Sequence, residues 1–203
     1  MIYVEQFGRI DPALPLREQA ERCVGLLEQL HAQIVLHWAD GAPGWAPAAA
    51  TAVISRSRLD RQSSLCACLR MWLDPPAEQN TDGRLILAWA NLGSLVEGTL
   101  KVFLSVYAHN YGKNPKRDRR GQDVDPDTLR FEDLRLFFRD NVWLQSQTAW
   151  DGWLQCVQRR RNAIHAYRHT EIGTHDEFLC AVVGYRLLAD ELSEQIPSWS
   201  GHE

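Results

Sequence analysis

Hydrophobic residues recur along most of this chain with a spacing near 3.6 residues, the period of an α-helix. Proline and glycine cluster between the periodic segments, at residues 41–47, 74–83 and 112–126. No segment alternates polar and apolar residues over the length of a strand. The pattern therefore predicts an all-α fold, an up-and-down bundle of about five to six helices.

The proline and glycine clusters and the helical period together place the expected helices along the sequence. These helices span residues 15–38, 48–73, 83–111, 125 to 141 or 145, 150–169, and 175 or 176 to 196. The third is long and apolar on most sides, so we expect it to be the central helix. The fourth should begin at Asp125-Pro126, because Asp is a good N-cap and Pro is favoured at the first helical position. Four side chains of the second should point inward: Val53, Leu65, Leu69 and Trp72.

Length and composition fit one domain over residues 1–203. Hydrophobic residues make up 45% and charged residues 24%, which is ordinary for a globular protein. The net charge of −4 argues against a protein that coats nucleic acid through bulk electrostatics. No apolar segment is long enough for a membrane span, and the N-terminus lacks a signal architecture. We therefore expect a cytoplasmic protein with no membrane partner.

The cysteines are odd in number, and most lie in apolar helical patterns. Cys66 and Cys68 form a C-x-C without the second pair that a zinc site needs. We expect all five to be reduced thiols in or near the core: Cys23, Cys66, Cys68, Cys156 and Cys180.

The segment 112–125 (GKNPKRDRRGQDVD) is polar, charged and flanked by helices. It is the one candidate for a region of low order in the sequence. It is either a solvated loop or a basic lip that contacts a nucleic-acid backbone.

The most informative stretch is residues 158–169, QRRRNAIHAYRH, near the end of the fifth expected helix. Arg160 and His165 are five residues apart and Tyr167 follows two later, which gives R-x-x-x-x-H-x-Y. Arginine carries a permanent charge in a fork suited to phosphate oxygens, and histidine exchanges protons near neutral pH. An arginine and a histidine together are the minimum set of functional groups for metal-free cleavage of RNA.

The residues RRNAIHAY resemble the motif of the HEPN superfamily, an arginine followed after four to six residues by histidine and often by a tyrosine. The resemblance implies a small helical bundle that dimerises with the two motifs facing each other. It also implies a metal-independent endoribonuclease without a cofactor, of the kind found in toxin–antitoxin and antiphage systems. The expected partners are RNA, a second copy of the chain, and an antitoxin or regulatory protein.

The family arginine is either Arg160 or Arg161. Family members usually have Asn, Asp or His directly after the arginine, and Arg161 is followed by Asn162. Arg160 keeps both the gap to His165 and the position of Tyr167, so we prefer it. Arg161 is then a second phosphate ligand.

The chemistry follows from side-chain properties. His165 would remove the proton of the RNA 2′-hydroxyl or protonate the departing 5′ oxygen, and Arg160 would hold the scissile phosphate. Asn162 would orient the phosphate or the histidine, and Tyr167 would hydrogen-bond the backbone or stack on a base. The remaining expected RNA-binding residues are Arg159, Arg161 and Arg168.

Glu97 lies on an otherwise apolar face of the third expected helix. An unpaired carboxylate there would be unfavourable, so we expect an arginine of the fifth helix to pair with it. Glu97 is then either a member of the catalytic site or half of a buried ion pair that only orients helices.

Other interpretations of the motif remain open. His165 and His169 are four residues apart, with His175 and Asp176 close behind, but no acidic residue stands between the histidines as in a zinc protease, and we expect no metal. A non-catalytic HEPN-type module that binds nucleotides, RNA or a protein is one alternative function. A structural helical protein whose arginines stabilise a dimer is another.

A homodimer is expected from the chemistry of cleavage. One motif supplies a single histidine, whereas attack by the 2′-hydroxyl needs one group to accept a proton and another to donate one. A two-fold dimer would bring two copies of the motif together across one cleft.

Overall fold

The computed structural model describes residues 13–40, 46–75, 80–143, 149–165, 167 and 169–196. These residues form eight α-helices joined by short 3-10 and π segments, with no strand among them. The only strand-like pairing in the described part of the chain is an isolated bridge between Arg117 and Asp123. The all-α class is confirmed, but the number of helices exceeds the predicted five to six.

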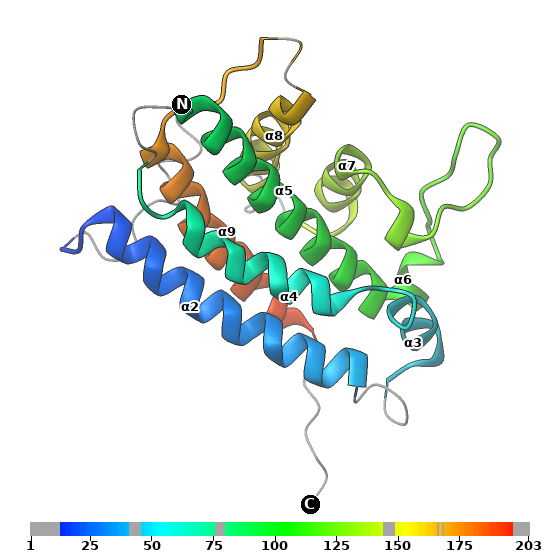
Figure 1. Ribbon diagram of the computed structural model, residues 1–203. Helices are drawn as coiled ribbons and strands as arrows, with labels where there is room; N and C mark the ends of the chain where they lie inside the picture. Colours follow the sequence, from blue (N-terminus) through cyan, green and yellow to red (C-terminus); the bar gives the residue numbers. More distant parts are fainter. Residues whose placement is uncertain are drawn as a thin grey trace, which may run out of the picture.

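The central helix is α5 (Thr81–Val106), which continues after Tyr107 into α6 (Ala108–Tyr111). It crosses the molecule with α2 and α9 on one side and α7 and α8 on the other (Figure 1). Leu92, Leu95, Val96 and Leu100 of α5 are fully buried. The prediction of a long central helix is confirmed, and this helix connects the two ends of the molecule.

Helices α2 (Leu16–Ile34, extended by a π segment to Asp40) and α9 (His175–Gln195) pack against each other. A buried polar group joins both to α5: His31 Nε2 lies 2.7 Å from the Tyr185 hydroxyl, which lies 2.8 Å from Thr99 Oγ1. Burial lowers the pKa of His31 to about 4, so this imidazole is neutral at physiological pH. Three core helices are thus held in register by hydrogen bonds as well as by packing.

The second predicted helix is divided into α3 (Ala48–Ile54), α4 (Leu59–Ala67) and a 3-10 turn (Cys68–Trp72). The break has a local cause, because Ser55 and Ser57 donate hydrogen bonds to the carbonyls of Ala52 and Ile54. Of the side chains predicted inward, Val53 and Leu69 are buried and Trp72 is half-buried. The inward placement of Leu65 is wrong, since 37% of its surface is exposed.

The fourth predicted helix begins later than its proline indicated. Pro126–Thr128 is a 3-10 turn, and α7 spans Phe131–Asn141. Between them the backbone is extended at Leu129 and Arg130, which places the Leu129 side chain in the core. The Asp125-Pro126 pair thus starts a short turn, with no side-chain cap from Asp125.

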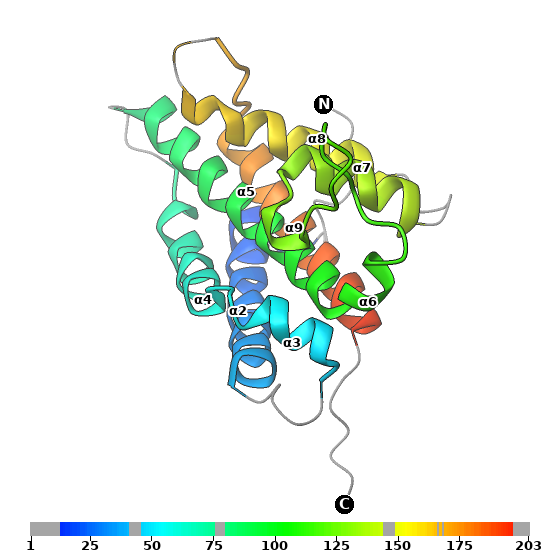
Figure 2. The ribbon, with the colours of Figure 1, turned by 90° about the vertical axis from the view of Figure 1, so that its right-hand side faces the viewer.

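The fifth predicted helix is shorter than expected. Helix α8 spans Ala149–Arg161 and gives way to a 3-10 turn at Asn162–His165, so it does not reach His169 (Figure 2). Its first turn packs beside α7 and its last turn lies beside the N-terminal part of α5. The candidate motif therefore spans the end of a helix.

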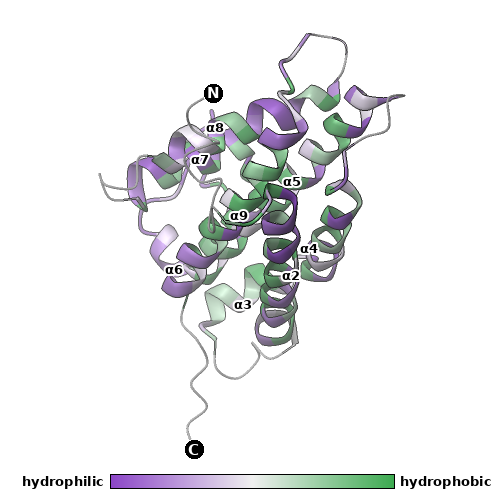
Figure 3. Cartoon of the chain, turned by 90° about the vertical axis from the view of Figure 1, so that its left-hand side faces the viewer, coloured by the Kyte–Doolittle hydropathy of each residue, from purple (hydrophilic) through white to green (hydrophobic). Residues whose placement is uncertain are grey.

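Hydrophobic residues are concentrated along α5 and α9 in the interior, and hydrophilic residues on the outside of α2, α6 and α8 (Figure 3). No described helix is long and apolar enough to cross a membrane. All five cysteines are free, with Cys23 and Cys66 buried and the other three partly buried, as predicted. Burial raises the pKa of the Cys23 thiol to about 11.

Candidate functional site

The three consecutive arginines at the end of α8 point in different directions. Successive side chains of an α-helix are about 100° apart around its axis. Arg160 is therefore turned into the protein, Arg161 lies along α5, and Arg159 is exposed to solvent. Each arginine consequently has a different chemical environment.

Arg160 is buried, with 4% of its side chain exposed. Its guanidinium carbon lies 4.9 Å from the ring centre of Trp89 on α5, and its Nη2 donates to Oε1 of Glu177 on α9 at 2.9 Å. A cation over an indole face and a charge-assisted hydrogen bond offset part of the loss of hydration, while Nε and Nη1 of Arg160 are buried without a hydrogen-bond partner among the described residues. Arg160 thereby ties α8 to α5 and to the first turn of α9.

Glu177 also closes the N-terminus of α9. Its Oε2 accepts a hydrogen bond from the Thr174 N–H at 2.8 Å, while its own N–H donates to Thr174 Oγ1 at 3.2 Å, which is a capping box. Desolvation alone would raise the pKa of Glu177, but the hydrogen bonds from Arg160 and Thr174 hold the pKa below its usual value. The carboxylate is therefore charged at neutral pH.

Gly173 is required by this arrangement. Its φ is +70°, a conformation that side chains with a Cβ rarely adopt. A Cβ at this position would also collide with Arg160 Nη2 and Glu177 Oε2. The backbone of residue 173 thus lies directly over the buried ion pair.

Glu97 of α5 pairs with Arg161, whose Nη2 lies 2.8 Å from Glu97 Oε2. The other carboxylate oxygen, Oε1, lies 2.8 Å from Nζ of Lys101. The stem of Arg161 crosses Gly93, where a Cβ would stand only 2.5 Å from Arg161 Cγ. The predicted arginine partner of Glu97 is confirmed and is Arg161, which keeps 32% of its side chain exposed.

The remaining candidate residues face solvent. Arg159, Asn162 and His165 are exposed, and Tyr167 is 99% exposed. The His165 side chain makes no hydrogen bond or ion pair with another described residue. Arg168 lies outside the described residues.

The structure thus divides the candidate residues between two sides of the α8 terminus. As predicted, Arg160 and His165 lie at the end of a helix beside α5. They do not share a face, because the Arg160 guanidinium points inward and the His165 imidazole outward. In this arrangement Arg161 and Arg159 are the arginines that can reach a ligand in solvent.

Two residues of this region, Gly173 and Glu177, were not singled out in the sequence, and Trp89, a residue expected in the core, was not predicted to contact Arg160. The predicted helix start at residue 175 or 176 already placed Glu177 in the first turn, and the segment Thr174-His-Asp-Glu177 has the pattern of a capping box that could have revealed its capping role. No pattern indicated that Glu177 would also receive Arg160, since that contact depends on how α8 and α9 pack.

The histidines near the motif are not gathered around a metal position. No group of three or more His, Cys, Asp or Glu side chains that could hold a metal ion occurs within the described ranges. His169 is exposed, and His175 Nε2 lies 2.9 Å from the carbonyl oxygen of Trp72, to which it donates.

Comparison with known proteins found no matching family model, no matching curated protein and no matching solved structure. Functional assignment therefore rests on the residues of this chain and on the resemblance of its short motif.

Proposed function

We propose that this protein is a metal-independent endoribonuclease of the HEPN type. The observation that carries the proposal is the exposed imidazole of His165 at the α8 terminus, on the same short stretch as Asn162 and Tyr167 and next to the partly exposed Arg161. A solvent-facing histidine four residues after a partly exposed arginine would serve as proton carrier, and the arginine as phosphate ligand, on one substrate.

The proposed reaction uses the nucleophile that RNA itself carries. One His165 accepts the proton of a 2′-hydroxyl, whose oxygen attacks the adjacent phosphorus. The bond from phosphorus to the 5′ oxygen breaks, and a protonated histidine donates its proton to that oxygen. The products are a 2′,3′-cyclic phosphate and a 5′-hydroxyl, and no metal or cofactor takes part.

The geometry revises the roles of the two candidate arginines. Contact between Arg160 and a phosphate would require its guanidinium to leave Glu177 and Trp89. We therefore assign the phosphate contact to Arg161, aided by Arg159, and we assign Arg160 as a positioning residue that fixes the end of α8. Glu97 would hold Arg161 in place, which makes Glu97 a positioning residue as well.

The proposal includes a homodimer with a composite site. Ile164, next to His165, keeps 44% of its surface exposed, and Tyr167 is almost completely exposed. A two-fold contact at the α8 termini would cover both apolar surfaces and bring the two His165 side chains to one substrate. It would also supply the second proton-transfer group that the reaction needs.

The motif extends the proposal to a cellular role. Ribonucleases that the motif resembles act as toxins or antiphage effectors, so we propose an effector restrained by an antitoxin or regulatory protein. A cytoplasmic location belongs to the same proposal, since it would give access to RNA and keep the five free thiols reduced.

Burial of Arg160 favours one alternative, a HEPN-type module that binds RNA, nucleotides or a protein without cleaving. A motif arginine that is already paired with Glu177 is unavailable for stabilising a transition state. Such a module would retain the exposed surface of Arg159, Asn162 and Tyr167 for binding.

A cleavage assay in EDTA tests the proposal. Wild-type protein should cut single-stranded RNA and leave 2′,3′-cyclic phosphate ends. His165→Ala should lose about 100-fold or more of this activity, the usual contribution of a general acid or base. Its free energy of unfolding should stay within about 1–2 kcal/mol of wild type, because the side chain is outside the core.

His169→Ala is the matched control, since it removes another exposed histidine four residues away and should cleave normally. If His165→Ala cleaves as wild type does, His165 is not catalytic. RNA binding without cleavage by the wild-type protein would select the alternative module. Sedimentation of a monomer at assay concentration would contradict the composite site.

A further inference from the structure

A second region with the chemistry of a binding site lies between segment 113–117, α6 and α7. Two open cavities of about 470 and 390 Å³ adjoin there and share three lining residues, Asn114, Phe137 and Asn141. Each volume is in the range of small-molecule sites. We call the larger cavity the basic lobe, lined by Lys113, Lys116, Arg117 and Asp140, and the smaller one the amide lobe, lined by Tyr107, Asn110, Tyr111 and Gln195.

The amide lobe combines aromatic walls with amide groups. The ring centres of Phe103 and Tyr107 are 4.9 Å apart, and those of Tyr111 and Phe137 are 5.1 Å apart. The rings of Tyr107 and Phe137 are only half-buried. Half-buried rings offer a face or an edge to a flat, apolar ligand.

The amides at this lobe are suited to the edge of a base. Asn114 Nδ2 lies 3.3 Å from Asn141 Oδ1, a long and exposed bond, and the Asn110 amide has no hydrogen bond to a described residue. An amide group both donates and accepts, as do the edges of nucleobases. A base that enters the lobe would thus contact the aromatic rings with its flat face and the amide groups with its hydrogen-bonding edge.

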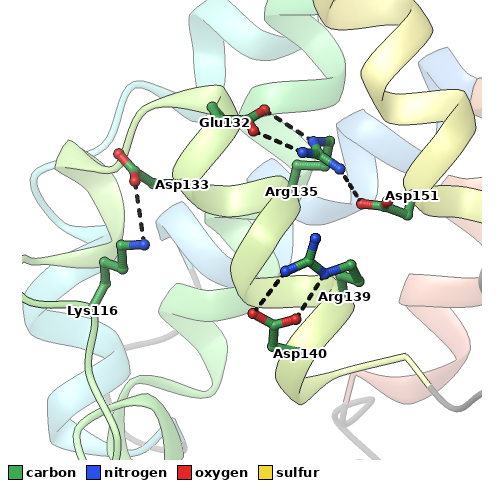
Figure 4. A network of polar contacts seen from close by, with 7 residues as sticks. All are labelled: Lys116, Glu132, Asp133, Arg135, Arg139, Asp140 and Asp151. Carbon is green, nitrogen blue, oxygen red and sulfur yellow. Dashed lines mark hydrogen bonds and ion pairs between the residues drawn. The ribbon is translucent and has the colours of Figure 1, made fainter.

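The basic lobe carries positive charge that the protein compensates only in part. Lys116 Nζ lies 3.5 Å from Asp133 Oδ1, and Arg117 Nε lies 3.2 Å from Asp123 Oδ1 (Figure 4 shows the first contact). Lys113 has no ion pair among the residues that the structure describes. These contacts are long or exposed, so their cations can turn to an incoming anion.

Asp140 is the one carboxylate that lines the basic lobe, and its charge is already engaged. It receives hydrogen bonds from Arg139 at 2.8 and 3.2 Å, which hold its pKa below the usual value (Figure 4). The adjacent Arg135 is likewise paired, with Glu132 and Asp151. Of the α7 carboxylates, only Asp133 contacts a cation of the lobe, Lys116, and it does so at 3.5 Å with both side chains partly exposed, so a phosphate can compete for that contact.

The segment that carries these cations is held in a defined shape. Val124 N–H donates to the Lys116 carbonyl, and Asp118 Oδ1 accepts hydrogen bonds from the N–H groups of Arg120 and Gln122. Tyr111, which lines the amide lobe, donates through its hydroxyl to the Val124 carbonyl. The two lobes are thus built as one unit, with Tyr111 joining them.

We propose that this cleft binds a nucleoside phosphate, with the base in the amide lobe and the phosphate at Lys113, Lys116 and Arg117. An aromatic and amide cavity continuous with a cationic one matches a ligand with a flat hydrogen-bonding end and an anionic end. The ligand is either a free nucleotide or one nucleotide of an RNA chain, since both present the same chemistry.

The cleft is separate from the α8 terminus and does not rest on the proposed cleavage reaction. Trp89, which contacts Arg160, lies within the first half of α5, and Tyr107, which lines the cleft, is the C-cap of the same helix. At a helical rise of 1.5 Å per residue they are roughly 25 Å apart. An occupied cleft would be a second site on the molecule.

Titration calorimetry of the full chain tests the proposal with AMP, ADP, adenosine and pyrophosphate. AMP or ADP should bind saturably, and adenosine and pyrophosphate at least about tenfold more weakly, because each fills one lobe only. A short single-stranded RNA, measured with His165→Ala protein so that it stays intact, distinguishes a free nucleotide from a nucleotide within a chain.

Two pairs of variants locate the site. Lys113→Glu with Arg117→Glu should weaken binding by about tenfold or more, whereas Arg119→Glu with Arg120→Glu makes the same charge change outside the lobe and should have little effect. Asn110→Trp should obstruct the amide lobe, and His109→Trp, on an exposed neighbour outside the lining, should not.

Saturable binding of a nucleotide or RNA that is lost in Lys113→Glu/Arg117→Glu and Asn110→Trp, and kept in both controls, supports the proposal. It is overturned if no nucleotide or RNA binds at millimolar concentration, or if test and control variants weaken binding equally. If the wild-type protein binds nucleotide in the cleft but does not cleave RNA, the proposed function is contradicted and the cleft proposal stands.

Discussion

The α8 terminus and the cleft beside α7 are both rich in basic residues, but the protein uses their charges differently. At the α8 terminus, Arg160 and Arg161 each have a carboxylate partner within the fold, Glu177 and Glu97. At the cleft, the pairs of Lys116 with Asp133 and of Arg117 with Asp123 are partly or largely exposed, and Lys113, which lines an open cavity, has no carboxylate partner among the described residues. The comparison shows that a run of arginines in a sequence is not in itself a surface charge available to a ligand.

Neighbouring residues of the α8 terminus differ for the same reason. The Arg160–Glu177 pair is almost completely removed from water, whereas Arg161 keeps a third of its side chain exposed. A buried charge depends on its partner far more than an exposed one does, since water can replace the partner of an exposed charge. Stability measurements on matched variants can therefore separate the two environments.

The largest expected effect is that of Glu177→Gln on stability. The substitution keeps a side chain that can complete the capping box but leaves the buried Arg160 charge uncompensated, so it should lower the free energy of unfolding by about 3 kcal/mol. Glu97→Gln should lower it by about 1 kcal/mol or less, because Arg161 can turn to solvent. Chemical denaturation of both variants measures this difference. If the two variants lose the same free energy of unfolding, the buried and the exposed ion pair do not differ as proposed.

The effect of Glu177→Gln should also depend on pH. The folded-state pKa of Glu177 is lowered, so its contribution is present above the unfolded value of 4.5 and is lost as pH falls through the folded-state value. The difference between wild type and variant should thus shrink in acid. His31 also titrates in acid, but it does so in both proteins and cancels in the difference.

The next effect concerns the backbone over the buried pair. Gly173→Ala should lower the free energy of unfolding by about 2 kcal/mol or more, through backbone strain together with displacement of Arg160 and Glu177. Gly121→Ala is the control, because Gly121 has a φ of +77° but open space around its Cβ position. The free energy of unfolding of Gly121→Ala should fall by only about 1 kcal/mol, because the substitution adds backbone strain alone. If thermal or denaturant unfolding shows the same loss of stability in Gly173→Ala and Gly121→Ala, the Arg160–Glu177 pair tolerates the displacement.

The smallest expected effect is that of the cleft cations on stability. Lys113→Glu with Arg117→Glu removes the exposed Arg117–Asp123 pair and should change the free energy of unfolding by about 0.5 kcal/mol or less. A large loss of free energy of unfolding in the same denaturation experiment would mean that these cations stabilise the fold. The cleft would then not differ from the α8 terminus in this respect.

Long periodic segments bounded by prolines, glycines or capping residues were predicted well. The pattern placed α2, α5 and α9 within a few residues, because their apolar positions repeat at the helical period. It missed the break at Ser55 and Ser57 and the late start of α7. Both depend on local hydrogen bonds and on the burial of Leu129, which periodicity does not express.

The candidate site was predicted in part. Glu97 was recognised because a carboxylate on an apolar face needs a partner, and an arginine of α8 provides one. The burial of Arg160 was not predictable, since it requires knowledge of which way the last turn of α8 faces and of Trp89 and Glu177 across the packing interface. The cleft joins α5, α6, α7 and the end of α9, and no short motif describes such a set.

The two oxygens of Glu177 also have a consequence for the way this end of the molecule unfolds. One oxygen holds Arg160, 17 residues earlier in the chain, and the other holds the first turn of α9. A local opening that pulls the carboxylate away releases both contacts at once and restores the conformational entropy of the intervening segment. The end of α8 and the beginning of α9 thus form one cooperative unit, closed by a single side chain.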